Sequence, residues 1–245
     1  YPDRYQFSLP IYSRISSDQA VERLIGLDVV GFSTYVWNYR ISLEIARKLK
    51  AVCPETLIVF GGPQVPDRAE DFLRQHPWVD LAVHGEGEPI FLSILENFPS
   101  RTWDGIGSIS FIDNTGRFVG HPRAERLRDI TTIPSPYLEG VFDPLMAANP
   151  DERWLILWET NRGCPFQCTF CDWGSATAAK VSQFNIERLL KEVDWFAAQK
   201  IEFIFCCDAN YGMLPRDYEI TKYVVDTKSR LGYPKALSVQ NTKNG

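Results

Sequence analysis

Apolar and polar positions in the first hundred residues switch between short continuous apolar runs and stretches with helical spacing. The apolar runs at Leu27–Ser33, Thr56–Phe60 and Val79–Val83 are rich in β-branched residues and have glycine at or near their carboxyl ends, which is consistent with buried strands. Helices are expected after Asn38, which is a plausible N-cap, and at 66–75 and 89–97. The first of these helices carries its apolar residues on one face, at Ile41, Ile45, Leu49 and Val52. This alternation of strand and helix predicts a parallel sheet of the doubly wound type.

A second strand–helix rhythm begins at Trp154. Its expected elements are strands at Trp154–Trp158, Ile201–Phe205 and Ala236–Val239, and helices after Asn185 and at Arg216–Arg230. Residues 99–151 break both rhythms with a β-hairpin near 108–120 and a proline-rich stretch, which we interpret as a linker. The sequence therefore predicts one domain at 1–98, a linker at 99–151 and a second domain at 152–245.

The second domain has too few repeats to close a barrel by itself. Three βα repeats are fewer than the eight of a complete barrel. The first domain is also incomplete by the same reasoning, because its three expected strands make a thin sheet. We therefore expect that one or two strands precede Tyr1 and that the rest of the barrel follows Gly245.

Charge and composition narrow the classes of partner. The formal net charge is −5, so no broad basic surface indicates nucleic acid. No apolar run approaches the ~20 residues of a membrane helix. Half of the six cysteines lie in one short segment, which does not fit a disulfide framework. A cytoplasmic, reducing location without membrane contact is the expectation.

The clustered cysteines are the clearest chemical signal. Cys164, Cys168 and Cys171 follow the pattern C-x3-C-x2-C directly after an expected strand. A structural zinc site needs four ligands, and no second cysteine or histidine pair stands nearby. A 4Fe–4S cluster held by three thiolates leaves one iron open to a small molecule, which favours a reactive cluster. A zinc-stabilised binding module and a non-catalytic iron–sulfur electron carrier remain the alternatives, although electron carriers usually supply four cysteines.

With Arg162-Gly163 before the first cysteine and Phe170 before the last, this segment resembles the cluster loop of the radical S-adenosylmethionine (SAM) enzymes. The resemblance implies a (β/α) partial TIM barrel with the loop after its first strand. It also implies that the open iron binds SAM and that an electron from the cluster cleaves it to a 5′-deoxyadenosyl radical. The radical abstracts hydrogen from a substrate, and the electron comes from a reductant such as flavodoxin or ferredoxin.

The end of the next strand adds to the resemblance. Asp208-Ala209-Asn210-Tyr211 matches the Asp-x-Asn-aromatic sequence found there in many members that have an upstream cobalamin domain. The match implies that Asp208 and Asn210 contact the amino group of SAM, and a carboxylate and an amide oxygen are suitable acceptors for an ammonium. The alternative is an Asx turn that closes the strand.

The first domain resembles the cobalamin-binding domain that precedes many radical SAM domains. The resemblance lies in the order of its strand-end segments and implies cobalamin contacts from Ser33, Gly61, Gly62, Gly85, Glu86 and Gly87. Glycine at a strand end lets the backbone approach a large flat ligand. The Asp-x-His-x-x-Gly motif that supplies a cobalt ligand in mutase-type domains is absent, and none of the three histidines has that motif around it.

Tyr35 and Trp37 follow the first strand, in a loop expected on the ligand side of the sheet. Our hypothesis is that one of them packs against the lower face of the corrin, where a bulky apolar group excludes an axial ligand and favours methyl transfer. The alternative is ordinary packing of an aromatic side chain.

The sequence thus predicts an α/β protein in which a partial Rossmann-like cobalamin-binding domain precedes the first part of a radical SAM partial TIM barrel. The expected activity is that of a cobalamin-dependent methyltransferase acting on an unactivated carbon, or on phosphorus, of a small-molecule or peptide substrate. A cobalamin-dependent rearrangement or cyclisation without methyl transfer is the alternative.

Overall fold

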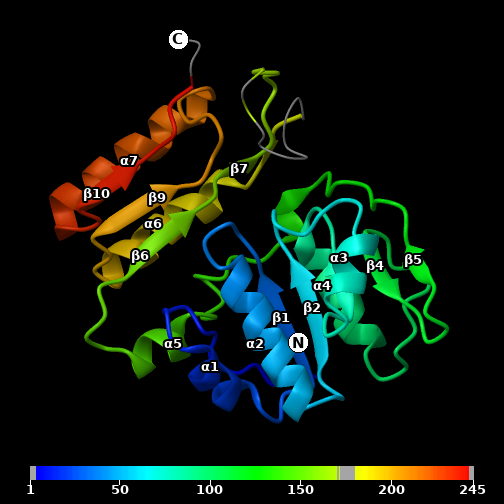
Figure 1. The fold of residues 1–245 in the computed structure, drawn as a ribbon. Helices are drawn as coiled ribbons and strands as arrows, with labels where there is room; N and C mark the ends of the chain where they lie inside the picture. Colours follow the sequence, from blue (N-terminus) through cyan, green and yellow to red (C-terminus); the bar gives the residue numbers. More distant parts are fainter. Residues whose placement is uncertain (1–3, 170, 172–179, 243–245) are drawn as a thin grey trace. The chain divides into compact units, whose positions relative to one another are not determined.

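The computed structural model describes residues 4–169, 171 and 180–242, and these form two compact units. One unit comprises Ile11–Leu127, and the other comprises Arg128–Gly245 together with Tyr1–Pro10. Each unit is built around its own sheet (Figure 1).

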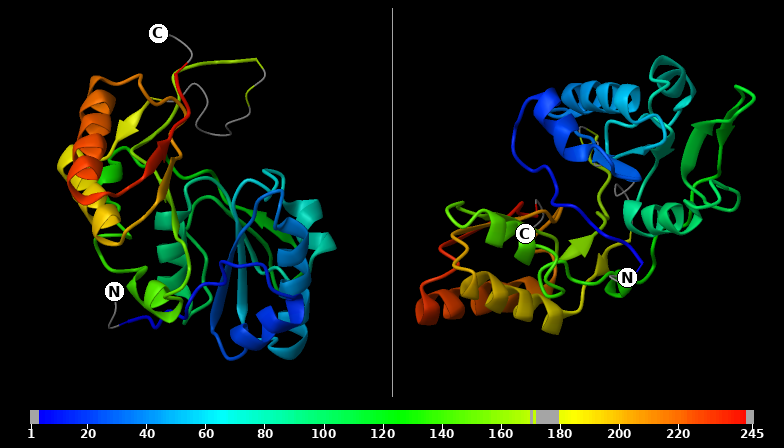
Figure 2. Two further views of the ribbon diagram at one scale, coloured as in Figure 1. Left: turned by 90° about the vertical axis from the view of Figure 1, so that its left-hand side faces the viewer. Right: turned by 90° about the horizontal axis from the view of Figure 1, so that it is seen from below.

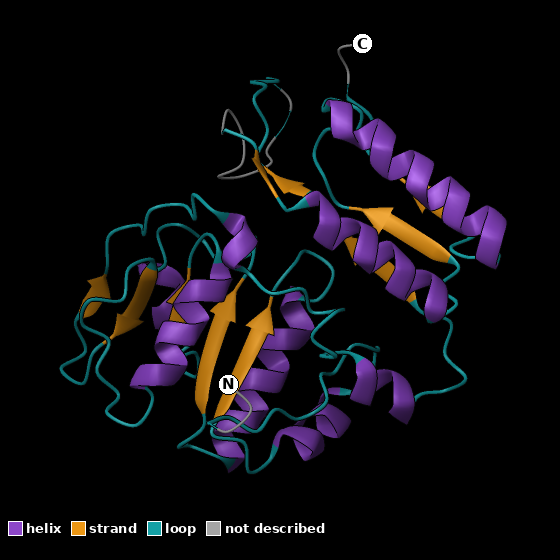
Figure 3. Cartoon of the chain, turned by 180° about the vertical axis from the view of Figure 1, so that it is seen from behind, coloured by secondary structure: helices purple, strands orange, loops and turns teal. Residues whose placement is uncertain are grey.

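A five-stranded sheet in the order β1-β2-β3-β4-β5 forms the first unit. Its strands are β1 (Val29–Ser33), β2 (Leu57–Gly61), β3 (Leu81–Val83), β4 (Ile109–Ile112) and β5 (Phe118–Gly120). Its helices are α1 (Ser17–Leu24), α2 (Tyr39–Val52), α3 (Glu70–Gln75) and α4 (Gly87–Asn97). Strands β1, β2 and β3 are parallel, so their carboxyl ends lie at one edge, as the two central arrows of Figure 3 show for β1 and β2.

Alternate residues of the parallel strands point into two separate cores. Ile58 and Phe60 pack in one core with residues of α1, α2 and α3. Leu57 and Val59 pack in the other, where Ile94 of α4 is fully buried. Burial on both faces explains why these strands read as continuous apolar runs. The predicted doubly wound arrangement of the three parallel strands is confirmed.

The hairpin placed in the expected linker belongs to this sheet. Strand β4 pairs antiparallel with β3, through Ala82 and Ser110, and β5 pairs antiparallel with β4. The compact unit consequently extends to Leu127, beyond the expected domain boundary at residue 98.

Helix α1 was not expected from the sequence. The Ser16 side chain accepts a hydrogen bond from the Gln19 backbone N–H, and the Gln19 side chain accepts from the Ser16 N–H, which is a capping box. Ala20 and Val21 bury the inner face of this helix against the first core.

The second unit holds a three-stranded parallel sheet in the order β10-β9-β6. Its elements are the 3-10 helix η1 (Ile130–Thr132), α5 (Asp143–Ala148), β6 (Leu155–Trp158), β7 (Asn161–Arg162), β8 (Ser182–Gln183), α6 (Ile186–Ala198), β9 (Phe203–Cys206), α7 (Pro215–Leu231) and β10 (Ala236–Ser238). Helices α6 and α7 lie side by side along the sheet (Figures 1 and 2). The βα order is that of a barrel's first repeats, as the sequence predicted.

A buried polar group links α6 to the sheet. The Trp158 indole N–H donates to Glu192 Oε2 at 2.7 Å, and Arg188 Nε donates to Glu192 Oε1 at 2.9 Å. Glu192 is 1% exposed, so both partners are needed to compensate its burial. This contact fixes the strand from which the cysteine loop departs.

Among the described residues, no helix is long and apolar enough to cross a membrane.

Candidate functional site

Thr34 joins the carboxyl ends of β1 and β2 in the Ile11–Leu127 unit. Its backbone N–H and its hydroxyl both donate to the Gly61 carbonyl, at 2.7 and 2.8 Å. Gly62 follows with φ +97°, and a Cβ there would lie 2.6 Å from the Thr34 carbonyl oxygen. Only glycine fits this close approach. The predicted residues Ser33, Gly61 and Gly62 therefore meet at the carboxyl edge of the sheet, where open α/β sheets bind ligands.

The loop after β1 presents two aromatic side chains. Trp37 is 76% exposed and Tyr35 is 38% exposed, and their rings stack 4.7 Å apart at 6°. Asn38 shapes this loop, because its side chain accepts from the Tyr35 N–H and donates to the Ser33 carbonyl. Asn38 does precede α2, but its side chain does not cap that helix. The exposed stack is inconsistent with ordinary core packing of Trp37.

The loop after β3 contributes Gly85, Glu86 and Gly87 to the same edge. Gly85 adopts φ +78°, and Gly87 begins α4. Glu86 is partly buried and accepts a hydrogen bond from the Leu127 N–H at 2.7 Å. Glu86 thus holds the end of the Ile11–Leu127 unit against this loop.

His84 lies just before this loop and is 6% exposed. Its Nε2 lies 3.0 Å from the hydroxyl oxygen of Ser110. Burial, together with the positive charge of Arg123, lowers the pKa of His84 below its ordinary value. The buried ring therefore connects the end of β3 to β4 through its hydrogen bond with Ser110.

The base of the cysteine loop is closed by backbone pairing. Strands β7 and β8 pair antiparallel, and the Phe184 N–H donates to the Thr160 carbonyl at 3.1 Å. Gly163 adopts φ +112°, and a Cβ there would lie 2.5 Å from the Lys180 carbonyl oxygen. The glycine before the first cysteine is therefore required for closure of the loop.

Asp208 anchors one side of this base. Its Oδ1 accepts from the backbone N–H groups of Thr160 and Asn161, at 2.8 and 3.2 Å. Its Oδ2 accepts from the Asn161 amide at 2.8 Å and from the Thr160 hydroxyl. Burial raises the pKa of Asp208, and these hydrogen bonds oppose that rise. Both oxygens are engaged, so this geometry favours a structural role over the predicted contact with SAM, which stays a prediction.

Arg216 anchors the other side. Its guanidinium donates to the Phe184 carbonyl at 2.5 Å and to the Thr160 carbonyl at 2.6 Å. Thr160 precedes β7 and Phe184 follows β8, so one side chain holds both sides of the loop base.

Asn210 contacts the first cysteine of the loop. Its side-chain Nδ2 lies 3.1 Å from Cys164 Sγ, and both residues are buried, at 8% and 9% exposure. Cys168 is half-buried and Cys171 is exposed, and the Cys171 N–H donates to the Cys168 carbonyl at 3.1 Å. Phe170 lies outside the described residues.

The donor set, three cysteine thiols in one loop, suits an iron–sulfur cluster. All six cysteines are free thiols. In a 4Fe–4S cluster each thiolate binds a different iron, so three thiols in one loop can hold it. The buried amide at Cys164 suits a thiolate, which needs hydrogen-bond donors.

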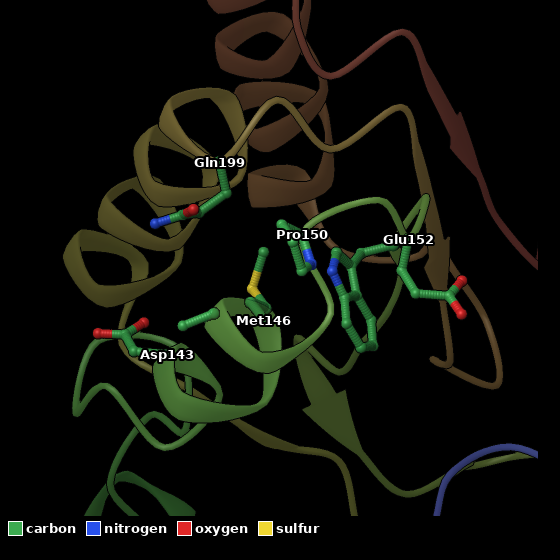
Figure 4. Close-up of a pocket in the computed structure, with 7 residues that line it drawn as sticks. Asp143, Met146, Pro150, Glu152 and Gln199 are labelled. Carbon is green, nitrogen blue, oxygen red and sulfur yellow. The ribbon is translucent and has the colours of Figure 1, made fainter.

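A separate cavity of about 390 Å³ lies at the amino ends of the strands of the second unit (Figure 4). It is lined by Asp143, Met146, Ala147, Pro150, Glu152, Trp154 and Gln199. Barrel active sites lie at the opposite, carboxyl ends of the strands, so this cavity is not a candidate catalytic site.

Sequence reasoning missed the residues that hold the loops in place. Thr34, Thr160, Asn161 and Arg216 were not assigned a role, although Asn161 stands in the run that contains the cysteines. Their partners are distant in sequence, as the 48-residue separation of Thr160 and Asp208 illustrates.

Known proteins match this chain along nearly its whole length. Residues 11–95 match the model of the B12 binding domain. A 2-(S-pantetheinyl)-carbapenam-3-carboxylate methyltransferase of Streptantibioticus cattleyicolor is 43% identical over 98% of this chain. The cobalamin-dependent radical SAM methyltransferase TokK of Streptomyces tokunonensis is 40% identical over the same share. The chain spans 36% of each of these two proteins.

Solved structures share the fold. The cobalamin-dependent SAM radical enzyme OxsB, with aqua-cobalamin and SAM bound, superposes with a TM-score of 0.66 at 20% identity, covering 91% of this chain and 31% of OxsB. The radical SAM methyltransferase TsrM of Kitasatospora setae gives 0.62 at 16% identity, covering 89% and 44%. The chain thus carries a match to the B12 binding domain at residues 11–95, and along nearly its whole length it is similar to proteins named as methyltransferases, one of them a cobalamin-dependent radical SAM enzyme.

Proposed function

We propose that this chain is part of a cobalamin-dependent radical SAM methyltransferase that transfers a methyl group to an unactivated carbon of a small molecule. The observation that carries the proposal is the closed loop of three free cysteines at the carboxyl end of β6, with Cys164 buried against Asn210. The matched relatives, of which this chain spans about a third, are named as methyltransferases.

Cys164, Cys168 and Cys171 would hold a 4Fe–4S cluster, which supplies an open iron for SAM and the electron for its cleavage. The chain's own residues fix the loop that presents these thiols, through Gly163 at its base and through the two anchors, Asp208 and Arg216. Asn210 is the acceptor that we assign to the SAM ammonium, through its amide oxygen. A low-potential reductant such as flavodoxin or ferredoxin would supply the electron.

The carboxyl edge of the β1-β2-β3 sheet would hold cobalamin, which supplies the methyl group. Gly62 and Gly85 leave backbone exposed to a flat ligand there, and Ser33 and Glu86 add polar contacts. The stacked rings of Tyr35 and Trp37 would supply an apolar contact for the corrin. Free thiols throughout the chain favour a reducing, cytoplasmic setting.

Similarity to a named methyltransferase supports the choice of a first substrate to test. At 43% identity, a carbapenam carboxylate that carries a thioether is the first compound to test. The full-length protein would be reconstituted anaerobically with iron, sulfide and cobalamin, then incubated with methyl-deuterated SAM, a reductant and that carbapenam. We expect 5′-deoxyadenosine and a product with a deuterated methyl group.

The other outcomes separate the alternatives. Formation of 5′-deoxyadenosine with a rearranged, unmethylated product indicates a rearrangement or cyclisation enzyme. An intact cluster that never cleaves SAM indicates an electron carrier. Zinc without iron in the purified protein indicates a zinc-stabilised module, and it would overturn the proposal.

A further inference from the structure

The contact between Asn210 and Cys164 places a hydrogen-bond donor on a cluster ligand. The amide nitrogen lies 3.1 Å from Sγ, and the residues are 46 positions apart in the chain. In the structure Sγ is a thiol, which stands in for the thiolate that would bind iron. A thiolate offers no proton, so it selects the N–H₂ end of the amide rather than the oxygen.

The segment that carries Asn210 is held on both sides. Two residues earlier, the Asp208 carboxylate binds the backbone just before the cysteine loop, at Thr160 and Asn161. One residue later, the Tyr211 N–H donates to the Gln240 carbonyl at 2.8 Å. The Tyr211 hydroxyl also donates to the Asp217 carbonyl at 3.1 Å. The amide is therefore positioned before any cofactor binds, and its burial excludes competing water.

We infer that Asn210 tunes the cluster by donating an N–H···S hydrogen bond to the Cys164 thiolate, which makes the cluster easier to reduce. This inference rests on the proposed function, because it requires a 4Fe–4S cluster on this loop. One-electron reduction adds a negative charge to the cluster. A fixed donor dipole at a ligand sulfur stabilises the more negative state more strongly, so it raises the reduction potential. Asn210 is thus a positioning and tuning residue, in addition to any contact with SAM.

The test compares reduction potentials in the full-length, anaerobically reconstituted protein. Asn210→Leu keeps the approximate size of the side chain and removes the donor. Asn241→Leu makes the same chemical change at an exposed residue nearby, on the segment that bridges to Tyr211. The cluster is titrated with dithionite and redox mediators and followed by its EPR signal, and iron content is measured in each protein. We expect a more negative midpoint potential for Asn210→Leu and an unchanged potential for Asn241→Leu.

A wild-type measurement covers the case in which Asn210→Leu fails to retain iron. Protein labelled with ¹⁵N in asparagine side chains is reduced, and pulsed EPR is used to detect a ¹⁵N nucleus coupled to the cluster. In Asn210→Gln, the remaining asparagines carry ¹⁵N and the glutamines carry ¹⁴N. Disappearance of the ¹⁵N coupling in this variant supports the contact. An unchanged potential in iron-replete Asn210→Leu overturns the inference, as does the absence of ¹⁵N coupling in the wild type. Failure of the wild-type protein to form a cluster would instead overturn the proposed function.

Discussion

The Asp208 carboxylate and Thr160 are joined by two hydrogen bonds, one from the Thr160 backbone N–H at 2.8 Å and one from its hydroxyl. The contact links the end of β9 to the segment between β6 and the cysteines. Thr160 is fully buried and Asp208 is 1% exposed, so the link is shielded from water. The second strand of the sheet thereby fixes the direction in which the cysteine loop leaves the first.

Replacing Asp208 with asparagine should loosen this link. In either orientation, the new amide nitrogen faces at least one N–H group that donated to the carboxylate, and that N–H group loses its acceptor. We expect the free energy of unfolding to fall by about 2–4 kcal/mol and the iron content after reconstitution to drop. Chemical denaturation and iron analysis measure both.

The matched control for Asp208→Asn is Asp226→Asn on the exposed face of α7, where the carboxylate pairs with Lys222. Its free energy of unfolding should change by no more than about 0.5 kcal/mol. Equal destabilisation by the two substitutions would contradict the anchoring role of Asp208.

Arg216→Met should open the base of the loop from its other side. The substitution removes two charge-assisted hydrogen bonds to the carbonyls of Phe184 and Thr160. A loss of about 2–3 kcal/mol in stability is expected, with lower iron occupancy. Arg216→Lys should recover only part of the loss, because an ammonium lacks the fork that reaches two carbonyls. Arg230→Met, on the exposed end of the same helix, serves as the control. Full recovery by lysine would argue against a bidentate clamp.

The elements that the sequence predicted correctly are those set by local pattern. Ile45 and Leu49 lie one helical turn apart and are both buried, as the helical spacing after Asn38 indicated. Asn185 caps α6 through a bond to the Glu187 N–H two residues on. Signals of this kind are complete within a few residues, so they can be interpreted without the fold.

What the sequence did not reveal depends on pairing between distant segments. The β4–β5 hairpin was recognised, but its attachment to β3 depends on the Ala82–Ser110 register, which no local signal encodes. The motif match at Asp208 predicted a contact with SAM, whereas the hydrogen bonds that Asp208 makes in the structure were hidden because its partners precede it by nearly 50 residues. Helix α1 is different, since its capping box at Ser16 and Gln19 was present in the sequence and was overlooked.

The β4–β5 turn should respond to acid through Asp113. Hydrogen bonds from Thr115 and Arg117 lower the pKa of Asp113 to about 2. A depressed folded-state pKa gives stability that is present above the ordinary pKa and is lost as the pH falls through the folded value. The wild-type hairpin should therefore lose stability between about pH 4 and 2. Asp113→Ala should lack this step. NMR titration of the turn measures both proteins, and a carboxyl that titrates near pH 4 in the wild type would contradict the prediction.

Trp37→Ala should weaken cobalamin binding while leaving the fold intact. The indole is 76% exposed and contacts Tyr35, so its removal should change the free energy of unfolding by no more than about 0.5 kcal/mol. Loss of the apolar stack should lower the cobalamin retained after gel filtration and change the visible spectrum of the bound cofactor. Tyr218→Ala removes another aromatic of similar exposure, 77%, from α7 and should alter neither. Unchanged cobalamin content and turnover in Trp37→Ala would exclude the proposed role.

Gly62→Ala should destabilise the carboxyl edge of the sheet, where we propose that cobalamin binds. The loss of stability should exceed the cost of placing alanine at a positive φ. A Cβ at Gly62 would lie 2.6 Å from the Thr34 carbonyl oxygen and 2.8 Å from the Thr34 nitrogen. A positive φ alone costs about 1–2 kcal/mol for alanine, and displacing packed backbone adds about 1–3 kcal/mol. We expect lower stability and lower cobalamin retention, measured by denaturation and by absorbance.

Gly105→Ala separates the two costs that act together in Gly62→Ala, which are the positive φ and the steric overlap of the new Cβ. Gly105 has φ +81°, close to the φ +97° of Gly62, but a Cβ at Gly105 would meet no atom of the described residues within 4 Å. Its substitution should therefore cost only the conformational contribution and leave cobalamin retention unchanged. If the free energy of unfolding falls equally in both variants and both retain the same amount of cobalamin, the close approach of Gly62 to Thr34 does not shape the carboxyl edge of the sheet.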